Sequence, residues 1–438
     1  MRFLLLLLFP FALSAQVSPF YSEVAPIPSA VTNNAVAYAN IADTTFIYSF
    51  AGLDSTKLWS GIHLKAWRLN LVNQEWQSIP PVPDPSGGKI AAGASTVKNK
   101  IYVIGGYHVA QNGSEVSSNK VHRYDPISNT WLSDGTPIPT AIDDQVQAVW
   151  RDSLIFVVTG WSNTTNVPNV QIYNPATDTW AAGTSVPNTN NYKVFGGSGV
   201  IVGDTLYYCG GASAGTNFPA TAYFRKGYIN PNNPLDITWS GFSSPAAKGY
   251  RMAAATMSGA AVWIGGSDIT YNYNGIAYNG SGGVPALARI KTYANFNPTL
   301  QYGLGESQGL LGAPALMDLR GVAQISSNYF YTIGGMESGQ KVSNKVYQYT
   351  WEYALNNTDI SNSVAVRIAP NPAQHYFRID LDGAFDLELL SPNGTVCRRL
   401  SGVNMLEVPT KGLAAGTYSV KIVQNNKVYA VERVVILN

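Results

Sequence analysis

The sequence predicts an all-β protein built as a circular array of six four-stranded units, followed by a small β-sandwich. Three observations lead to this prediction. A short glycine motif recurs along most of the chain at a spacing near 54 residues, the composition is rich in strand and turn residues, and the pattern changes to plain alternation from Val364 onwards.

The composition is that of a neutral, β-rich protein. Of 438 residues, 45% are hydrophobic and only 12% are charged, about half the usual share of roughly 25%. The 41 glycines and 25 prolines favour turns, and the length exceeds what one ordinary hydrophobic core supports. A net charge of +2 without basic runs excludes nucleic acid binding and electrostatic attachment to membranes.

The first 15 residues have the zones of a secretory signal peptide. Arg2 is followed by the apolar run Phe3 to Leu13, and then by Ser14 and Ala15, with cleavage expected after either of these two. The run is too short to cross a bilayer, and no later run reaches the roughly 18 apolar residues of a spanning helix. We therefore expect an exported chain without a membrane span.

The repeat is defined by glycines at the end of a short apolar strand. They are Gly52, Gly106, Gly160, Gly211, Gly266 and Gly335, which lie 54, 54, 51, 55 and 69 residues apart. Each unit starts with a small-residue strand such as Ala91 to Val97, and four of the six units continue with two more strands, the last containing Trp and followed by Pro. The strand before the Trp closes at Tyr124, Tyr173 and Tyr228 in three of these units and at Leu69-Asn70 in the first. Small residues suit the crowded axis of a radial array, and paired glycines allow close backbone approach.

These motifs resemble the Kelch family of β-propellers, in which a Gly-Gly pair is followed by spaced Tyr and Trp. The resemblance covers residues 16–355 and implies a six-bladed propeller. The first unit lacks the double glycine, and the fifth has Tyr302 where Trp is expected. The start of the array looks like the last strand of a blade, and the sixth unit stops without the segment from Trp to Pro that ends the first four units. We therefore expect residues near 18 to 25 to complete the sixth blade.

The last part of the chain has its own motifs. After a linker at 356–363, residues 364–438 alternate as short strands: Val364 to Ile368, Tyr376 to Leu381, Leu387 to Leu390, Tyr418 to Val423 and Val428 to Ile436. The segments Pro370-Asn371-Pro372, Ser391-Pro392-Asn393-Gly394 and Gly412 to Ile422 resemble the C-terminal sorting domain of the type IX secretion system of Bacteroidetes. The resemblance implies an Ig-like sandwich that addresses the protein outside the cell. A carbohydrate-binding or adhesive sandwich is the alternative.

The chain of a four-stranded meander reverses direction at every turn. The start of each first strand and the loop between the second and third strands therefore lie on the same face. Counting back 15 residues from the last glycine of each unit gives Ala91, Gln145, Gly196, Arg251 and Arg320. Arginines at this position resemble those of Kelch propellers that bind acidic peptides or sugars. The ligand-binding candidates on this face are Arg251, Arg320, Gln145, Asp143, Asp144, Lys89, Tyr107, Trp161, Tyr271 and Tyr273.

Aromatic planes stack on sugar rings, and the amide, carboxylate and guanidinium groups bind hydroxyls, so this mixture suits a glycan. The alternatives are loop packing for the aromatic residues and ion pairs with Asp143, Asp144 or Asp318 for Arg251 and Arg320.

Cofactor chemistry finds little support in the sequence. The four histidines have no metal-ligand spacing, and Cys209 and Cys397 are too far apart in sequence for a cysteine zinc motif. The copper oxidases with a Kelch-like fold need ligands absent here, and the half calcium loop around Gly275 lacks its acidic ends, Thr270 and Ser281 standing there instead. We expect no metal and no cofactor.

Two function classes and a structural one remain. The first is a non-catalytic, secreted or surface-bound module for glycans or surface proteins, exported by the type IX machinery through residues 364–438. The second is an enzyme resembling the Kelch mutarotases of sialic acid, in which Arg251, Arg320, Asp144 and Glu306 would act as acids and bases. The third is an adhesin or matrix protein. The sequence favours the first.

Overall fold

The computed structural model describes residues 18–271, 284–294, 303–308, 314–327, 329–352, 367–391, 396–424 and 427–437. The predicted signal peptide at 1–15, the predicted linker at 356–363 and Tyr302 lie outside the described residues. The chain divides into two compact units, one over Val17–Tyr353 and one that contains Ala354–Asn438.

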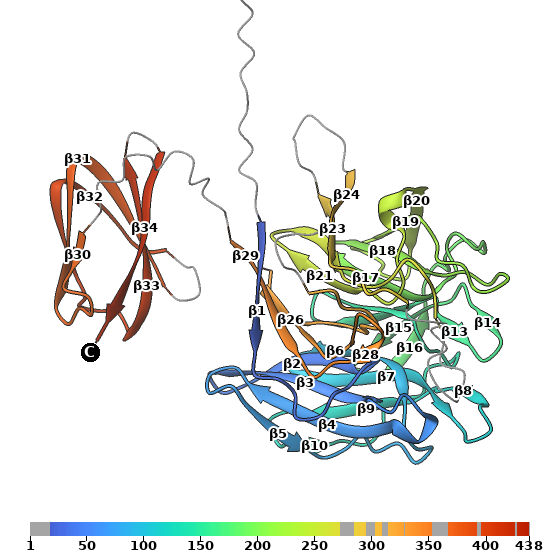
Figure 1. Cartoon of the computed structure of the whole chain (residues 1–438). Helices are drawn as coiled ribbons and strands as arrows, with labels where there is room; N and C mark the ends of the chain where they lie inside the picture. The colour runs from blue at the N-terminus through green and yellow to red at the C-terminus, as the bar shows by residue number, and fades with distance from the viewer. Residues whose placement is uncertain are drawn as a thin grey trace, which may run out of the picture. The chain divides into compact units, whose positions relative to one another are not determined.

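The first unit is a six-bladed propeller in the residues described, and each blade is an antiparallel four-stranded meander (Figure 1). Blade one contains β2 (Ala35–Ile41), β3 (Thr44–Leu53), β4 (Ile62–Asn70) and β5 (Glu75–Ile79). Blade two contains β6 (Ile90–Val97), β7 (Lys100–Val109), β9 (Val121–Asp125) and β10 (Thr130–Trp131), with β8 (Glu115–Ser117) added beside β7. Blade three contains β11 (Val146–Trp150), β12 (Leu154–Val158), β15 (Val170–Asn174) and β16 (Thr179–Ala182).

Blade four contains β17 (Phe195–Val202), β18 (Thr205–Ala212), β19 (Tyr223–Ile229) and β20 (Ile237–Ser243). Blade five contains β21 (Ala253–Met257), β22 (Ala260–Ile264), β23 (Arg289–Ala294) and β24 (Gly303–Gln308). Blade six contains β25 (Ala323–Ser326), β26 (Tyr329–Ile333), β29 (Val346–Glu352) and β1 (Ser18–Val24). The loops carry β13 (Trp161–Ser162) with β14 (Thr165–Asn166), β27 (Met336–Glu337) with β28 (Lys341–Val342), and the 3₁₀ turns η1 (Trp59–Gly61) and η2 (Pro245–Ala247).

The ring closes as the sequence predicted. Strand β1 lies beside β29 and pairs with it along its whole length, from Ser18 opposite Glu352 to Val24 opposite Val346 (Figure 1). Tyr21 packs against Tyr347 and Tyr349 with ring centroids 6.1 Å and 6.4 Å apart. The first described strand of the chain therefore completes the last blade, so that the two ends of the array hold each other.

The double glycines bring neighbouring blades into backbone contact. Gly105 and Gly106 at the end of β7 have φ of 68° and 85°, which only glycine adopts without strain. A Cβ on Gly105 would lie 2.4 Å from the carbonyl oxygen of Ile142 in the segment that leads into the next blade. The same close approach occurs at Gly210, Gly265 and Gly334.

The repeated tryptophans join blades one to four each to the blade before it. The indole N–H of Trp131 donates to the carbonyl of Pro80 at 2.9 Å, which lies in the segment leaving blade one. Equivalent bonds link Trp76 to Ala25, Trp180 to Thr136 and Trp239 to Thr184. The Trp of one unit and the segment that ends the preceding unit are therefore the two partners of one repeated hydrogen bond.

The second unit is a small Ig-like β-sandwich. It contains β30 (Arg367–Ala369), β31 (Tyr376–Leu390), β32 (Val396–Pro409), β33 (Gly416–Gln424) and β34 (Lys427–Ile436), paired in the order β30-β31-β33-β34 with β32 on the other side of β31. Its core contains Phe377, Leu387, Tyr418 and Val434.

One strand prediction for this unit was wrong, and one strand was missed. The segments 376–381 and 387–390 are one strand, β31, with irregular pairing between Leu381 and Ala384. Strand β32 was not predicted because most of its side chains are exposed, which leaves no apolar alternation to recognise.

Candidate functional site

A ring of backbone hydrogen bonds surrounds the propeller axis where the inner strands begin. One bond crosses each blade interface in the described residues: Ala91 N to Asn33 O, Asp144 N to Ala91 O, Gly196 N to Asp144 O, Arg251 N to Gly196 O, Leu319 N to Arg251 O and Asn33 N to Asp318 O, at 2.9 to 3.4 Å. The six residues Asn33, Ala91, Asp144, Gly196, Arg251 and Asp318 all have φ between 47° and 62°. This left-handed conformation costs energy for residues with a Cβ and persists because the ring bonds hold it.

The ring corrects the register that counting gave for two blades. The count of 15 residues is right for Ala91, Gly196 and Arg251, but the equivalent residue is Asp144 in blade three, not Gln145. In blade six it is Asp318 rather than Arg320. The hairpin between Trp150 and Leu154 is one residue longer than its counterparts, and the pairing of β25 with β26 is irregular.

Both arginines are buried in one ion-pair network, which we call the polar plug: Asp144, Arg251, Asp318 and Arg320. The Nη2 of Arg251 lies 2.6 Å from Oδ2 of Asp144, and its Nη1 lies 3.0 Å from Oδ1 of Asp318. Arg320 of blade six reaches Oδ1 of Asp144 of blade three at 3.1 Å, and all four side chains are at most 2% exposed. Two positive and two negative groups cancel, so the plug joins blades three, five and six without net charge.

Asp143 and Gln145 flank the plug and are also buried. Asp143 accepts a hydrogen bond from the Ser117 hydroxyl at 2.5 Å, and burial, with the neighbouring Asp144, raises the pKa of Asp143 well above its usual value. The amide nitrogen of Gln145 donates to the Ile104 carbonyl at 3.0 Å. Both side chains are therefore engaged inside the scaffold.

An apolar layer covers the plug on the face of the loops between second and third strands, which we call the loop face. Tyr107 and Tyr271 are buried in this layer together with residues from the other blades. The guanidinium of Arg251 lies 5.5 Å from the Tyr271 ring, and the Tyr271 hydroxyl donates to Asp318 at 3.3 Å. Trp161 is half-buried against Phe195, with ring centroids 5.5 Å apart, and Tyr273 lies outside the described residues.

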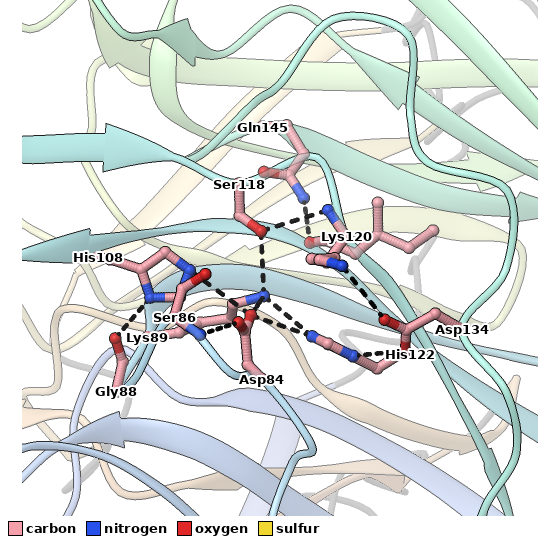
Figure 2. Close-up of polar contacts among 11 residues, drawn as sticks. Asp84, Ser86, Gly88, Lys89, His108, Ser118, Lys120, His122, Asp134 and Gln145 are labelled. Carbon is pink, nitrogen blue, oxygen red and sulfur yellow. Dashed lines mark hydrogen bonds and ion pairs between the residues drawn. The ribbon is translucent and has the colours of Figure 1, made fainter.

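Lys89 belongs to a different buried cluster, between blades one and two (Figure 2). Its Nζ lies 2.6 Å from Oδ2 of Asp84 and 3.2 Å from both Ser118 Oγ and His122 Nε2. His122 also contacts Asp134 through Nδ1 at 2.8 Å. Burial lowers the pKa of Lys89, although Asp84 opposes this effect. For Asp84, burial acts to raise the pKa, but hydrogen bonds with His108 and His122 and the Lys89 charge hold it well below its usual range.

The sequence did not identify Asp84, His122 and Asp134 as partners of Lys89. They lie in three separate segments, and their only sequence signal is that charged residues are rare in this chain. Since Lys89 and His122 are fully buried, the cluster stabilises the joint between the two blades rather than presenting Lys89 to a ligand.

Glu306 does not join the arginines with which it was grouped as a possible acid or base. It lies on β24, the outer strand of blade five, and accepts a hydrogen bond from Lys291 Nζ at 2.5 Å. The predicted set of Arg251, Arg320, Asp144 and Glu306 is therefore three members of the plug and one distant residue.

The loops of the loop face are connected to one another across blade boundaries. Lys57 Nζ donates to the Gln340 carbonyl at 3.0 Å, and the Ser117 and Asn163 loops exchange hydrogen bonds of 3.0 and 2.9 Å. Thr270 reaches the Asn217 carbonyl at 3.4 Å. Large apolar side chains are exposed on the same loops: Leu58 at 42%, Trp59 at 37%, Val116 at 57% and Ile269 at 55%.

A cavity of about 360 Å³ occupies the axis on the other side of the plug. All six inner strands line it, with Gln145 and Arg320 at the ring of backbone bonds and Tyr38, Thr96 and Asp152 toward the hairpins. Residues at the ring are buried, whereas those near the hairpins are half-buried or exposed, so the cavity opens on the hairpin face.

Among the described residues, no group of three or more His, Cys, Asp or Glu side chains is arranged to hold a metal ion. The same part of the chain contains no helix that is long and apolar enough to span a membrane.

Comparison with known proteins agrees with this architecture. Residues 91–133 match the family described as the Kelch motif, and residues 367–437 match the secretion system C-terminal sorting domain. The protein is a Kelch-type propeller with a type IX sorting domain. The sorting domain indicates type IX secretion and an extracellular or surface location.

The Kelch relatives share only part of their length with this chain. It is 22% identical to Kelch-like protein 36 of Bos taurus over 46% of this chain and 30% of that protein. It is 25% identical to Kelch-like protein 25 of Xenopus tropicalis, over 38% of this chain and 27% of that protein. For Kelch-like protein terF of Aspergillus terreus the identity is 27%, over 44% of each chain. This chain thus spans less than half the length of these relatives.

A solved structure, "Structure of YjhT", superimposes on the Kelch protein with a TM-score of 0.57 at 17% identity, covering 74% of this chain and 95% of that one. At this identity the likeness establishes the fold alone. The activity of this protein has to be inferred from its own residues.

Proposed function

We propose that this Kelch protein is a secreted, non-catalytic binding module whose loop face binds another protein at the cell surface. The observation that supports it most directly is the combination of cross-linked loops with exposed apolar side chains. Loops joined across three blade boundaries lose little conformational entropy on binding. Exposed apolar groups such as Trp59 and Val116 gain free energy when a partner covers them, since each fully buried side chain is worth about 1.5–3 kcal/mol.

The burial of the charged groups favours binding over catalysis. A mutarotase of the kind considered from the sequence needs acids and bases that reach a sugar, whereas Asp144, Arg251 and Arg320 are at most 2% exposed and bind one another. The candidates on the loop face therefore act as the support of the binding loops in this proposal. Interconversion of sugar anomers by the purified protein, followed by NMR, tests the enzyme alternative.

A glycan is the second candidate partner for the same face. Trp59, exposed at its loop, offers a ring on which a sugar can stack, and the half-buried Trp161 adds an aromatic edge. A purely structural adhesin would also use exposed apolar groups, but it would assemble with copies of itself.

The export signals complete the proposal. Residues 1–15 would direct the chain into the general secretory route as a cleaved signal peptide, and residues 364–438 would direct it through the type IX machinery of a Bacteroidetes outer membrane. The propeller at 16–355 is then the delivered module, and the segment 356–363 joins the two.

The test measures binding of the labelled secreted protein to intact cells of the producing species. Val116→Ser and Ile269→Ser remove exposed apolar groups from the loop face. Val72→Ser and Ile127→Ser make the same changes at Val72 (76% exposed) and Ile127 (71%), in turns between third and fourth strands on the opposite face. We expect each of the first two to weaken binding about tenfold, a loss of about 1.4 kcal/mol, and the second two to leave it unchanged.

Pretreatment of the cells identifies the partner class. Protease treatment that abolishes binding supports a protein, periodate oxidation that abolishes it supports a glycan, and binding only to cells already coated with this protein supports self-assembly. Equal effects of the two variant pairs would contradict the assignment of the loop face.

A further inference from the structure

The axial cavity on the hairpin side of the plug is a second site, separate from the loop face. Its volume of about 360 Å³ is within the range of roughly 300 to 1,000 Å³ that is usual for small-molecule pockets. The plug and the apolar layer lie between it and the loops that carry Trp59 and Val116. This site therefore does not depend on the proposed function of the loop face.

The floor of the cavity is polar but has no net charge. Arg320 is balanced by Asp144, and Arg251 by Asp318, so an anion finds no excess positive charge there. The Nε of Arg320 and the Oε1 of Gln145 are buried without a hydrogen-bond partner among the described residues. The orientation of Gln145 is determined, because the atom next to the Ile104 carbonyl has to be its donor nitrogen. Both atoms have almost no accessible surface, so a molecule in the cavity meets the paired, neutral groups of the floor and not these two atoms.

The wall adds polar backbone and uncharged side chains. The inner strand of each blade is an edge strand, and an edge strand presents unpaired N–H and C=O groups. Small residues such as Ala94 and Ala254 leave that backbone close to the cavity. Gln147 and Gln324 also line it, and their amides are held by bonds to Ser95 Oγ at 2.8 Å and to the Thr256 carbonyl at 3.0 Å. Asp152, at the open end, is paired with Lys98 at 3.3 Å.

We propose that the cavity binds a neutral, polyhydroxylated molecule of monosaccharide size, entering from the hairpin face. A hydroxyl group can donate a hydrogen bond to the free carbonyls of the inner edge strands and accept one from their free N–H groups, whereas a carboxylate can only accept. The floor has no excess positive charge to balance a carboxylate, so it also favours uncharged hydroxyl groups. The site therefore discriminates against acidic sugars of similar size.

The test is saturation-transfer NMR on the full-length secreted protein with D-glucose, D-galactose and N-acetyl-D-glucosamine, and with D-glucuronate as the charged comparison. Ala254→Phe in blade five and Ala94→Phe in blade two each place a ring in the cavity. Ala176→Phe makes the same change at an exposed turn of blade three and is the control. Tryptophan fluorescence checks that each variant is folded, and having two filling variants in different blades guards against the loss of one.

We expect at least one neutral sugar to bind, to bind at least tenfold more tightly than glucuronate, and to lose at least tenfold in affinity in Ala254→Phe and Ala94→Phe but not in Ala176→Phe. No transfer from any neutral sugar at about 10 mM, above the millimolar range of weak ligands, would mean that the cavity holds only water and would overturn the proposal. Equal or tighter binding of glucuronate, or undiminished binding in both filling variants, would overturn it too. Cell binding by Ala254→Phe should remain normal, which separates a failure here from a failure of the loop-face proposal.

Discussion

The polar plug makes a quantitative prediction for Arg251→Met. The guanidinium of Arg251 is fully buried and forms three charge-assisted hydrogen bonds, two with Asp144 at 3.2 and 2.6 Å and one with Asp318 at 3.0 Å. Removing one partner of a buried ion pair costs about 3–5 kcal/mol, because the other charge stays buried without compensation. Asp144 keeps Arg320 as a partner, so we expect the lower end, about 3 kcal/mol. At about 2–4 °C per kcal/mol for large domains, the melting temperature should fall by about 6–12 °C.

In the intact protein, the unfolding free energy of the propeller can be measured separately from that of the sorting domain. All ten tryptophans lie between positions 59 and 351, so tryptophan fluorescence during urea unfolding reports on the propeller and not on the sorting domain. Arg151→Met is the matched control: Arg151 forms a similar two-pronged pair with Asp204, at 3.1 and 3.0 Å, but its side chain is 51% exposed. We expect it to cost less than about 1 kcal/mol. If Arg251→Met costs no more than Arg151→Met, the plug is not a desolvated network and the reasoning is wrong.

Three further predictions test the scaffold. Burial, followed by the charge of Lys65, lowers the pKa of His63 to about 4. Between pH 6.5 and 4 the unfolded chain therefore binds a proton at His63 that the folded chain does not bind, which favours unfolding. Stability should fall by about 2 kcal/mol between pH 6.5 and 4, and urea titrations should show this slope reduced in His63→Leu. Gly265→Ala should lower the unfolding free energy by about 3 kcal/mol, because its φ is 66° and its Cβ would lie 2.2 Å from a carbonyl oxygen of blade six; a loss under 1 kcal/mol would contradict the close blade contact. Burial raises the pKa of Cys209 to about 12, so a thiol reagent at pH 8 should modify the exposed Cys397 only, and Cys209 should react only after unfolding.

The repeated features of the fold could be predicted from the sequence because each has a local physical cause. Paired glycines indicate backbone contact between blades, and the Trp near the end of a unit indicates an indole hydrogen bond to the preceding blade. Closure of blade six by β1 followed from the unmatched ends of the array. Strand β32 could not be predicted, since an exposed strand carries no apolar pattern.

The site could be predicted only in part. Counting along the repeat located Arg251, but one extra hairpin residue in blade three shifted the count by one residue to Gln145. In blade six the count is two residues off, at Arg320 instead of Asp318, and the irregular pairing of β25 with β26 accounts for one of the two. A register error of one residue moves a side chain to the other face of a strand, so position along the chain alone does not decide exposure.

The sequence by itself determined that this protein is a neutral, all-β repeat array followed by a sorting domain, and it predicted that several of its few charges gather near one end of the propeller axis. Only the tertiary structure decided what those charges do. Asp144, Arg251, Asp318 and Arg320 come from three blades and bond to one another in the interior, because a buried charge is stable only beside its opposite. That pairing closes the axis toward the loops and leaves a neutral cavity behind it, a distinction that depends on contacts between residues up to 176 positions apart.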